Sequence, residues 1–261
     1  MLIIILAAAA AAPTTQPSDA QITGAPILDI SFGGDVAFNI SVGGGSPSST
    51  RPGSVFGPDV SHYQGTVRWR DVEAAGASFA FAKASEGLHT TDDQFSANWA
   101  GMRAVGIKVR GAYHFGHPEE DALAQVRHFL SQIPMPLAPG DLLVLDIEAA
   151  GGKSPSEVAT WTGDFLGGLM KATGLPASRV LVYTGAWFWN SQAGGSSIAS
   201  EHPLWVSGYV SAPPMPKGWA GWTYWQYTDK ATDCGPSGSA VDCSVFHGSL
   251  DQLHARAGLL S

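Results

Sequence analysis

Between residues 55 and 184, short apolar runs alternate with longer segments in which apolar positions recur every three or four residues. The first pattern is typical of strands that are buried on both faces, and the second is typical of helices that cover a sheet. The strands are expected at 55–61, 78–84, 108–115, 142–148 and 180–184. The helices are expected at 69–75, from Thr91 to about 105, at 119–133 and at 155–174.

Two of these helices begin with a sequence that is typical of a capping box. In the first, Thr91 is placed to cap the helix and Gln94 to reach back to it. In the second, Ser154 and Glu157 have the same spacing, and Pro155 occupies the first helical position. Both helices are therefore expected to start at these residues.

After residue 184 the alternation of strands and helices breaks down. Short strands are expected at 204–208, 223–227 and 241–246, with no helix-length pattern between them, and a last helix at 250–257. Five βα units followed by short irregular or antiparallel strands predict an α/β fold, a modified TIM-type barrel. An open doubly wound sheet is the alternative. No glycine-rich phosphate loop follows a strand, so the sequence offers little support for nucleotide binding.

The N-terminal residues have a different character from the rest. Residues 1–12 are apolar and end in alanines, which resembles the hydrophobic part of a secretory signal, although no positively charged segment precedes them. Either the signal is unusual or the true start lies upstream; we expect export, with residues 1–25 signal-like and disordered. Residues 26–54 contain possible short strands and a Gly/Ser/Pro linker. The main domain is expected at 55–258.

Composition narrows the range of functions. The chain has 261 residues, is 44% hydrophobic and has a net charge of −8, which suits one large domain or two small ones and offers no basic patch for nucleic acid. The apolar N-terminal segment is too short to span a bilayer. We expect no integral membrane span, no cofactor and a monomer. Cys234 and Cys243 could pair and close a short loop in an oxidising compartment, or could remain free thiols.

The strongest chemical signal follows the apolar run 142–145. Asp146 and Glu148 alternate with Ile147, so both should point to one face of a strand, roughly 7 Å apart. Like charges this close cannot both ionise freely, which would make one carboxyl a proton donor and leave the other anionic. The alternative is that both acids simply meet water or cap the next helix.

The other predicted strands also end in polar or aromatic residues. In a barrel of this kind, these ends meet at the face where catalysis occurs. Acids and aromatic rings that converge there, without a serine or cysteine nucleophile motif, favour glycoside hydrolysis. The residues concerned are Asp59, Ser61, His62, Gln64, Lys83, Glu86, Tyr113, His114, Tyr183, Trp205, Trp225, Gln226 and Asp242.

Several ordered motifs resemble those of the family 25 glycoside hydrolases, the Chalaropsis-type lysozymes. Residues 59–65 (DVSHYQG) resemble the opening signature DVSxxQG, and residues 83–87 (KASEG) resemble the second-strand motif. Residues 111–115 (GAYHF) and the D-x-E pair at 146–148 follow in the family's order. The resemblance covers residues 56–248 and implies a peptidoglycan-cleaving N-acetylmuramidase.

The resemblance also implies roles for individual residues. Glu148 would be the general acid, Asp146 would tune its pKa and orient the substrate, and Asp59 and Asp242 would complete an acidic cluster. The second catalytic group would be either a carboxylate or the substrate's own acetamido group. The residues expected to bind substrate are Gln64, Glu86, His114, Tyr113, Tyr183, Trp205 and Trp225. After Asp242 the chain departs from the family pattern; a Cys234–Cys243 disulfide would brace this loop.

Simpler interpretations remain for some of these residues. Glu86 could pair with Lys83 instead of binding sugar, and Tyr113 and Trp205 could fill the core. His114 and His117 have the spacing of metal ligands, but two ligands make no site, so no metal is expected. The competing functions are a catalytically silent peptidoglycan-binding module and a glycosidase that acts on another N-acetylhexosamine polymer, such as chitin.

Overall fold

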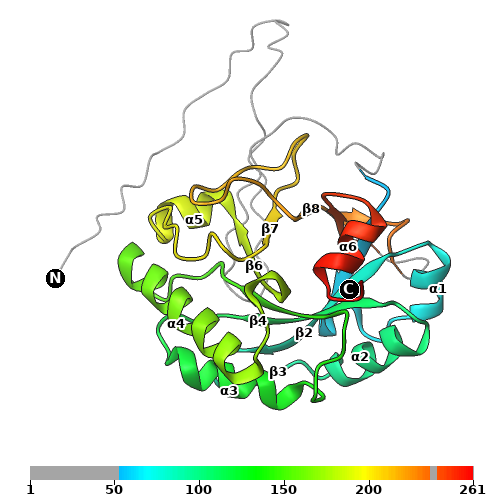
Figure 1. Cartoon of the computed structure of the whole chain (residues 1–261), viewed down its shortest axis with the longest axis horizontal. Helices are drawn as coiled ribbons and strands as arrows, with labels where there is room; N and C mark the ends of the chain where they lie inside the picture. The colour runs from blue at the N-terminus through cyan, green and yellow to red at the C-terminus, as the bar shows by residue number, and fades with distance from the viewer. Residues whose placement is uncertain (1–52, 236–239, 261) are drawn as a thin grey trace, which may run out of the picture.

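A computed structural model describes residues 53–235 and 240–260. Within them, eight strands form a closed barrel that is surrounded by helices (Figure 1). The barrel strands are β1 (Phe56–Val60), β2 (Phe79–Glu86), β4 (Val109–Phe115), β5 (Asp141–Asp146), β6 (Val180–Gly185), β7 (Leu204–Ser207), β8 (Tyr224–Ala231) and β9 (Val241–Phe246). The two-residue strand β3 (Thr90–Thr91) pairs with the end of β2 outside the barrel.

Five helices follow the strands around the outside, and the last helix contributes Leu253 to the core inside the barrel. The helices are α1 (Trp69–Ala74), α2 (Phe95–Ala104), α3 (Ala122–Gln132), α4 (Pro155–Thr173), α5 (Ala186–Gln192) and α6 (Leu250–Arg256). In Figure 1, α1 to α4 lie in order around the lower half of the barrel, and α5 lies beyond β6 at the upper left.

The strand pairing confirms the modified barrel and excludes the open doubly wound sheet. The order is β1-β9-β8-β7-β6-β5-β4-β2, and β1 pairs in parallel with β2 to close the circle. All neighbours are parallel except those of β9, which runs antiparallel to both β8 and β1. The irregularity expected after the fifth strand is therefore confined to one reversed strand, which also carries Asp242.

Strand alternation divides the core into two layers. Phe79, Phe81, Leu142 and Val144 belong to the cluster inside the barrel. Their neighbours Ala80, Ala82, Leu143 and Leu145 belong to the cluster between the barrel and the helices. Successive side chains of a strand point to opposite faces. Whether a polar residue can reach the site therefore depends on whether its position in the strand faces into the barrel or toward the helices.

The structure differs from the local predictions at three places. Thr91 does not cap a helix but lies in β3; α2 begins at Phe95, and the side chain of Asp92 accepts the backbone N–H of Gln94 at 3.0 Å. The helix α5 was not predicted, because its apolar residues stand together at 186–189 instead of recurring every three or four residues. The third predicted helix also starts later than expected, at Ala122, where Asp121 is the cap.

The second capping box is confirmed. Ser154 Oγ accepts the backbone N–H of Glu157, and Glu157 Oε2 accepts the backbone N–H of Ser154 at 2.9 Å. Pro155 is the first residue of α4, and Gly174 ends the helix with φ of 69°, a conformation that favours glycine. This fixes the loop between β5 and α4, which carries Glu148.

The expected leader and the possible strands at 27–42 lie outside the described residues. No helix within 53–235 and 240–260 is long and apolar enough to cross a membrane.

Candidate active site

Four carboxyl groups meet in a pocket of about 320 Å³. Asp59, Asp146, Glu148 and Asp242 all line it, and three of them are at or next to the carboxyl end of a parallel strand. Asp146 is the last residue of β5, and Glu148 follows it on the same side of the chain. The pair that the apolar run 142–145 predicted is therefore assembled in the barrel mouth.

Antiparallel pairing brings in the fourth acid. Asp59 of β1 and Asp242 of β9 are direct partners in the strand register. Like charges directly opposite each other destabilise a sheet, so this pairing has no evident structural advantage. The sequence separates the two residues by most of the domain, and the reversal of β9 is what unites them.

Burial and mutual repulsion raise the pKa of all four carboxyls. Burial and then the Asp242 charge raise the pKa of Glu148 from 4.5 to about 7. Burial and then Asp229 raise the pKa of Asp242 to about 7 as well. Burial is also the largest cause of the raised pKa of Asp59 and Asp146. The cluster therefore retains protons at neutral pH.

Two of the acids have partners that favour their ionised form. Gln226 Nε2 donates to both oxygens of Asp59, at 3.0 and 3.2 Å. The Lys83 ammonium lowers the pKa of Asp146 against the raising effects of burial and Glu148. For Glu148, both causes of its pKa shift favour the neutral form. Glu148 thus has no contact that favours its ionised form, which suits a general acid, although burial also raises the pKa of Asp59 and Asp146 well above the ordinary value.

Gln226 also holds two tyrosines. Its Oε1 accepts the hydroxyl of Tyr183 at 2.7 Å and that of Tyr209 at 3.2 Å. One buried amide thus orients Asp59 from one end and two pocket-lining phenols from the other. Because both the nitrogen and the oxygen of this amide are hydrogen-bonded, glutamine is required at this position for its hydrogen bonds rather than for its packing.

We expect Gln226→Met to lower the free energy of unfolding by about 1–3 kcal/mol, because it leaves Asp59 and the two tyrosine hydroxyls without their buried partner. Chemical denaturation measures this loss. Gln132→Met, on the partly exposed side of α3, is the matched control and should stay within about 0.5 kcal/mol of the parent. Equal stability of the two variants would contradict the role of Gln226.

Most residues predicted to bind substrate also line the pocket. Tyr113, Tyr183 and Trp205 do so from β4, β6 and β7. Gln64 lines it too, although its Oε1 accepts the backbone N–H of Ser61 at 2.8 Å. Glu86 lines the pocket and pairs with Lys83, 2.5 Å from Glu86 Oε2 to Nζ, as the simpler interpretation expected.

Two of the predicted site residues lie elsewhere. His114 is fully buried on the helix side of β4, where Ser85 Oγ and Gln125 Oε1 lie 2.9 and 3.0 Å from its ring nitrogens. Burial is the main cause that lowers its pKa to about 3. Trp225 belongs to the outer core layer, and its Nε1 donates to the carbonyl of Gly208 at 2.8 Å. Both predictions were wrong because each residue has a neighbour in the strand that faces inward instead.

The site also contains residues that the sequence did not single out as ligands. Tyr209 lies in the loop after β7, where no motif marks it. Lys83 lies in the middle of β2 and Gln226 near the start of β8, and only their contacts reveal what they do. Among the described residues no group of three or more metal-ligating side chains occurs.

Cys234 and Cys243 form a disulfide, with Cα atoms 6.0 Å apart. Both cysteines are fully buried in the outer core. Cys243 directly follows Asp242 on β9, so the bond ties this strand to the chain that leaves β8. Ser244, the next residue, accepts the indole N–H of Trp205 at 2.9 Å. Both residues after Asp242 thus anchor the strand that carries this acid.

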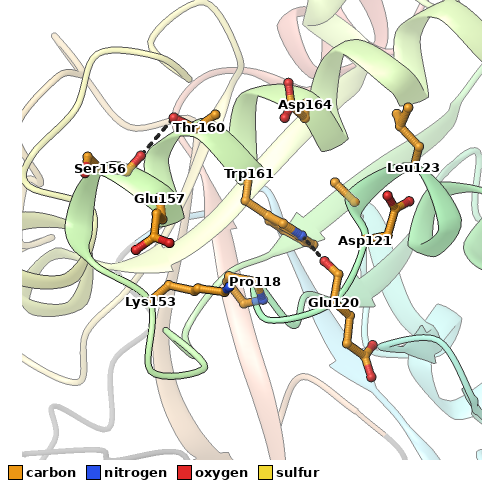
Figure 2. A pocket seen from close by; sticks show the side chains of 11 residues that line it. Pro118, Glu120, Asp121, Leu123, Lys153, Ser156, Glu157, Thr160, Trp161 and Asp164 are labelled. Carbon is orange, nitrogen blue, oxygen red and sulfur yellow. Dashed lines mark hydrogen bonds between the residues drawn. The ribbon is translucent and has the colours of Figure 1, made fainter.

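A second, larger hollow of about 620 Å³ lies between the first turns of α3 and α4 (Figure 2). The indole of Trp161 crosses it, and its N–H donates to the carbonyl of Glu120 at 2.7 Å. Acidic side chains surround it, but the carboxyls with strongly raised pKa lie in the barrel mouth instead. We therefore assign the chemistry to the smaller pocket.

Comparisons with known proteins find relatives over most of the described residues. The model of the family "Glycosyl hydrolases family 25" matches residues 58–235. Lysozyme M1 of Streptomyces globisporus is 39% identical over 217 residues, which are 78% of this chain and 71% of that protein. N,O-diacetylmuramidase of Chalaropsis is 32% identical over 214 residues, 77% of this chain and 97% of that protein.

Solved structures are similar over the same region. The lysozyme from Streptomyces coelicolor superposes with a TM-score of 0.74 at 36% identity and covers 80% of this chain and 99% of its own. A family 25 lysozyme from Aspergillus fumigatus gives a TM-score of 0.71 at 30% identity, covering 78% and 99%. The matched residues 58–235 contain Asp59, Asp146 and Glu148 and end before Asp242.

Proposed function

The chain belongs to glycosyl hydrolase family 25, and we propose that it is a lysozyme in which Glu148 and Asp146 carry out the cleavage of peptidoglycan. The bond cleaved is the β-1,4 linkage between N-acetylmuramic acid and N-acetylglucosamine. The observation that carries the assignment of residues is the buried pair at the end of β5, in which burial raises the pKa of Glu148 to about 7 while the Lys83 ammonium favours the ionised form of Asp146.

In this mechanism Glu148 donates its proton to the oxygen of the glycosidic bond as that bond breaks. The sugar ring then develops positive charge, and the anionic Asp146 stabilises it. Asp146 Oδ1 is buried and has no hydrogen-bond partner within the described part of the chain. An unpaired buried acceptor is costly, and a hydroxyl or amide N–H of the substrate would satisfy it.

The remaining groups of the pocket would position the sugar chain. Tyr113, Tyr183 and Trp205 offer apolar ring faces, and the tyrosines offer polar tips as well. Asp59, held by Gln226, and Asp242 complete the cluster of carboxyls. Those carboxyls of the cluster that are ionised favour the cationic transition state over the neutral substrate, which is what lowers a barrier.

The location of the enzyme follows from two further features. A leader-like apolar segment at 1–12 and a disulfide are both typical of exported proteins. We infer that the protein is secreted and acts outside the cell as a monomer. Residues 55–258 would form the hydrolase domain, with residues 26–54 as a linker.

Product analysis tests the function directly. Purified protein is incubated with peptidoglycan, and the new reducing ends are reduced and identified by mass spectrometry. A muramidase gives ends of N-acetylmuramic acid. Ends of N-acetylglucosamine would contradict the bond assignment, and binding of peptidoglycan without any cleavage would favour the silent binding module.

A further inference from the structure

A chain of ion pairs connects the active site to the surface. Lys83 Nζ lies 2.5 Å from Glu86 Oε2, and Glu86 Oε1 lies 3.0 Å from His117 Nε2. His117 Nδ1 in turn lies 3.0 Å from Glu119 Oε1. Each contact is within hydrogen-bond distance, and the charges alternate in sign when His117 is protonated.

The exposure of these side chains increases from the inside outward. The side chains of Lys83 and Glu86 are 10% and 15% exposed, while those of His117 and Glu119 are 28% and 40% exposed. The inner ion pair is therefore weakly screened by water, and the outer one is open to exchange protons with solvent. His117 stands between the two.

The inner end of the chain reaches the catalytic pair. In the barrel, Glu86 of β2, Phe115 of β4 and Asp146 of β5 lie level with one another on adjacent strands. The Lys83 ammonium lies 5.4 Å from the centre of the Phe115 ring, and its charge lowers the pKa of Asp146. Among the described residues that line the pocket, Lys83 is the single basic side chain.

Glu86 and Asp146 therefore share one cation. Lys83 lowers the pKa of both carboxyls, and Asp146 retains a buried oxygen with no partner. The Glu86 charge raises the pKa of Asp146, and a second cation bound to Glu86 offsets this effect, so that the Lys83 charge acts on Asp146 with less opposition. His117 is that second cation, since it bonds the other oxygen of Glu86.

We propose that His117 is a positioning residue of the enzyme: its positive charge holds Glu86, and through Glu86 it keeps the Lys83 ammonium beside Asp146, so that Asp146 bears the negative charge. This inference rests on the proposed function of the site. It extends that function to a residue outside the pocket. It also explains the acidic limb of the pH–activity profile, where kcat/KM falls because Asp146 becomes protonated.

The surroundings of His117 favour its protonated form. Burial lowers its pKa, but the bonds to Glu119 and Glu86 outweigh burial and raise it. Glu120 adds a third carboxylate nearby, since the side chains of Glu120 and His117 both pack against Gly87. On the opposing side, His114 is buried with a pKa lowered to about 3 and is therefore neutral, and the Lys153 charge acts on Glu119.

The experiment measures kcat/KM against pH for the parent and for His117→Gln, which keeps a polar side chain but never carries charge. We expect the acidic limb to move up by about half to one pH unit, a loss of about three- to tenfold at a pH on that limb. The alkaline limb should not move, because it belongs to Glu148. His117→Lys restores a permanent positive charge and should restore the acidic limb.

The matched control is His89→Gln, which changes an exposed histidine in the turn between β2 and β3 and should leave both limbs in place. An unmoved acidic limb in a folded, active His117→Gln variant would overturn the proposal. Equal displacement in His117→Gln and His117→Lys would do so too, because it would mean that shape and not charge matters.

A second measurement does not depend on catalysis. The ring of His117 is titrated by NMR in the parent and in Glu86→Gln, and its midpoint should fall when Glu86 loses its charge. A midpoint that stays constant overturns the chain of ion pairs even if the enzyme is active. If the parent cleaves nothing at any pH, the proposed function fails, and the titration still decides whether His117 is coupled to Glu86.

Discussion

Glu148→Gln is expected to lower kcat for peptidoglycan cleavage by about 10²- to 10⁴-fold, the contribution that a general acid typically makes. The amide has nearly the same shape as the protonated carboxyl but cannot release a proton to the leaving oxygen. The measurement is the rate at which reducing ends appear, with thermal unfolding followed in parallel to establish that the variant folds.

The control for this substitution is Glu73→Gln, which makes the same chemical change on the exposed side of α1. It should leave kcat within about twofold of the parent. A Glu148→Gln variant that retains a tenth or more of the parent's kcat would remove Glu148 from the role of acid. The proton would then have to come from Asp242, whose pKa is raised to a similar value by burial and Asp229.

The sequence was sufficient to locate the acid pair because two local rules coincide there. An uninterrupted apolar run marks a strand buried on both faces, and alternation then puts Asp146 and Glu148 on one face. The barrel followed from the repeated order of strands and helices. The rule that strand ends meet at one face of a barrel added Asp59 and Asp242, but their direct pairing could not be predicted, because it depends on the reversal of β9.

The errors at His114 and Trp225 come from neglect of the same alternation. Tyr113 and His114 are adjacent in one strand, so only one of them can face the pocket, and the structure places Tyr113 there. Trp225 and Gln226 form a second such pair, and Gln226 faces inward. An aromatic residue at a strand end is therefore a candidate for the site only after it is known which positions of the strand face into the barrel.

Lys83 and Glu86 show the opposite case, in which simple alternation fails. Their spacing of three residues would place them on opposite faces of a regular strand. The register between β2 and β4 shifts between Lys83 and Ser85, and this irregularity turns both side chains into the pocket. A bulge of this kind leaves no reliable mark in the sequence, and so the ion pairs that lead to His117 could not be inferred from it.

The acidic cluster that enables catalysis also opposes folding. Asp59, Asp146, Glu148 and Asp242 are brought out of water and close to one another, and each has a raised pKa as a result. In the unfolded chain the same carboxyls are solvated and far apart. The folded state therefore binds protons more tightly than the unfolded state, and its stability must depend on pH.

We expect Glu148→Gln to unfold less readily than the parent at pH 8, while the two proteins are similar near pH 4. Below its unfolded pKa of 4.5, Glu148 is protonated in both states and has no effect. As pH rises toward its folded pKa of about 7, the unfolded chain releases the proton and the folded one retains it, so stability is lost across this window. A difference of this size corresponds to about 3 kcal/mol.

The measurement is the free energy of unfolding from urea denaturation of both proteins at intervals between pH 4 and pH 8. The Glu148→Gln curve should lie progressively above the parent's curve, because the variant has no proton to lose at this position. Glu73→Gln should follow the parent at every pH, since that carboxyl is exposed in the folded state as well. Parallel curves for Glu148→Gln and the parent would mean that folding does not raise the pKa of Glu148, and its assignment as the acid at neutral pH would fail with it.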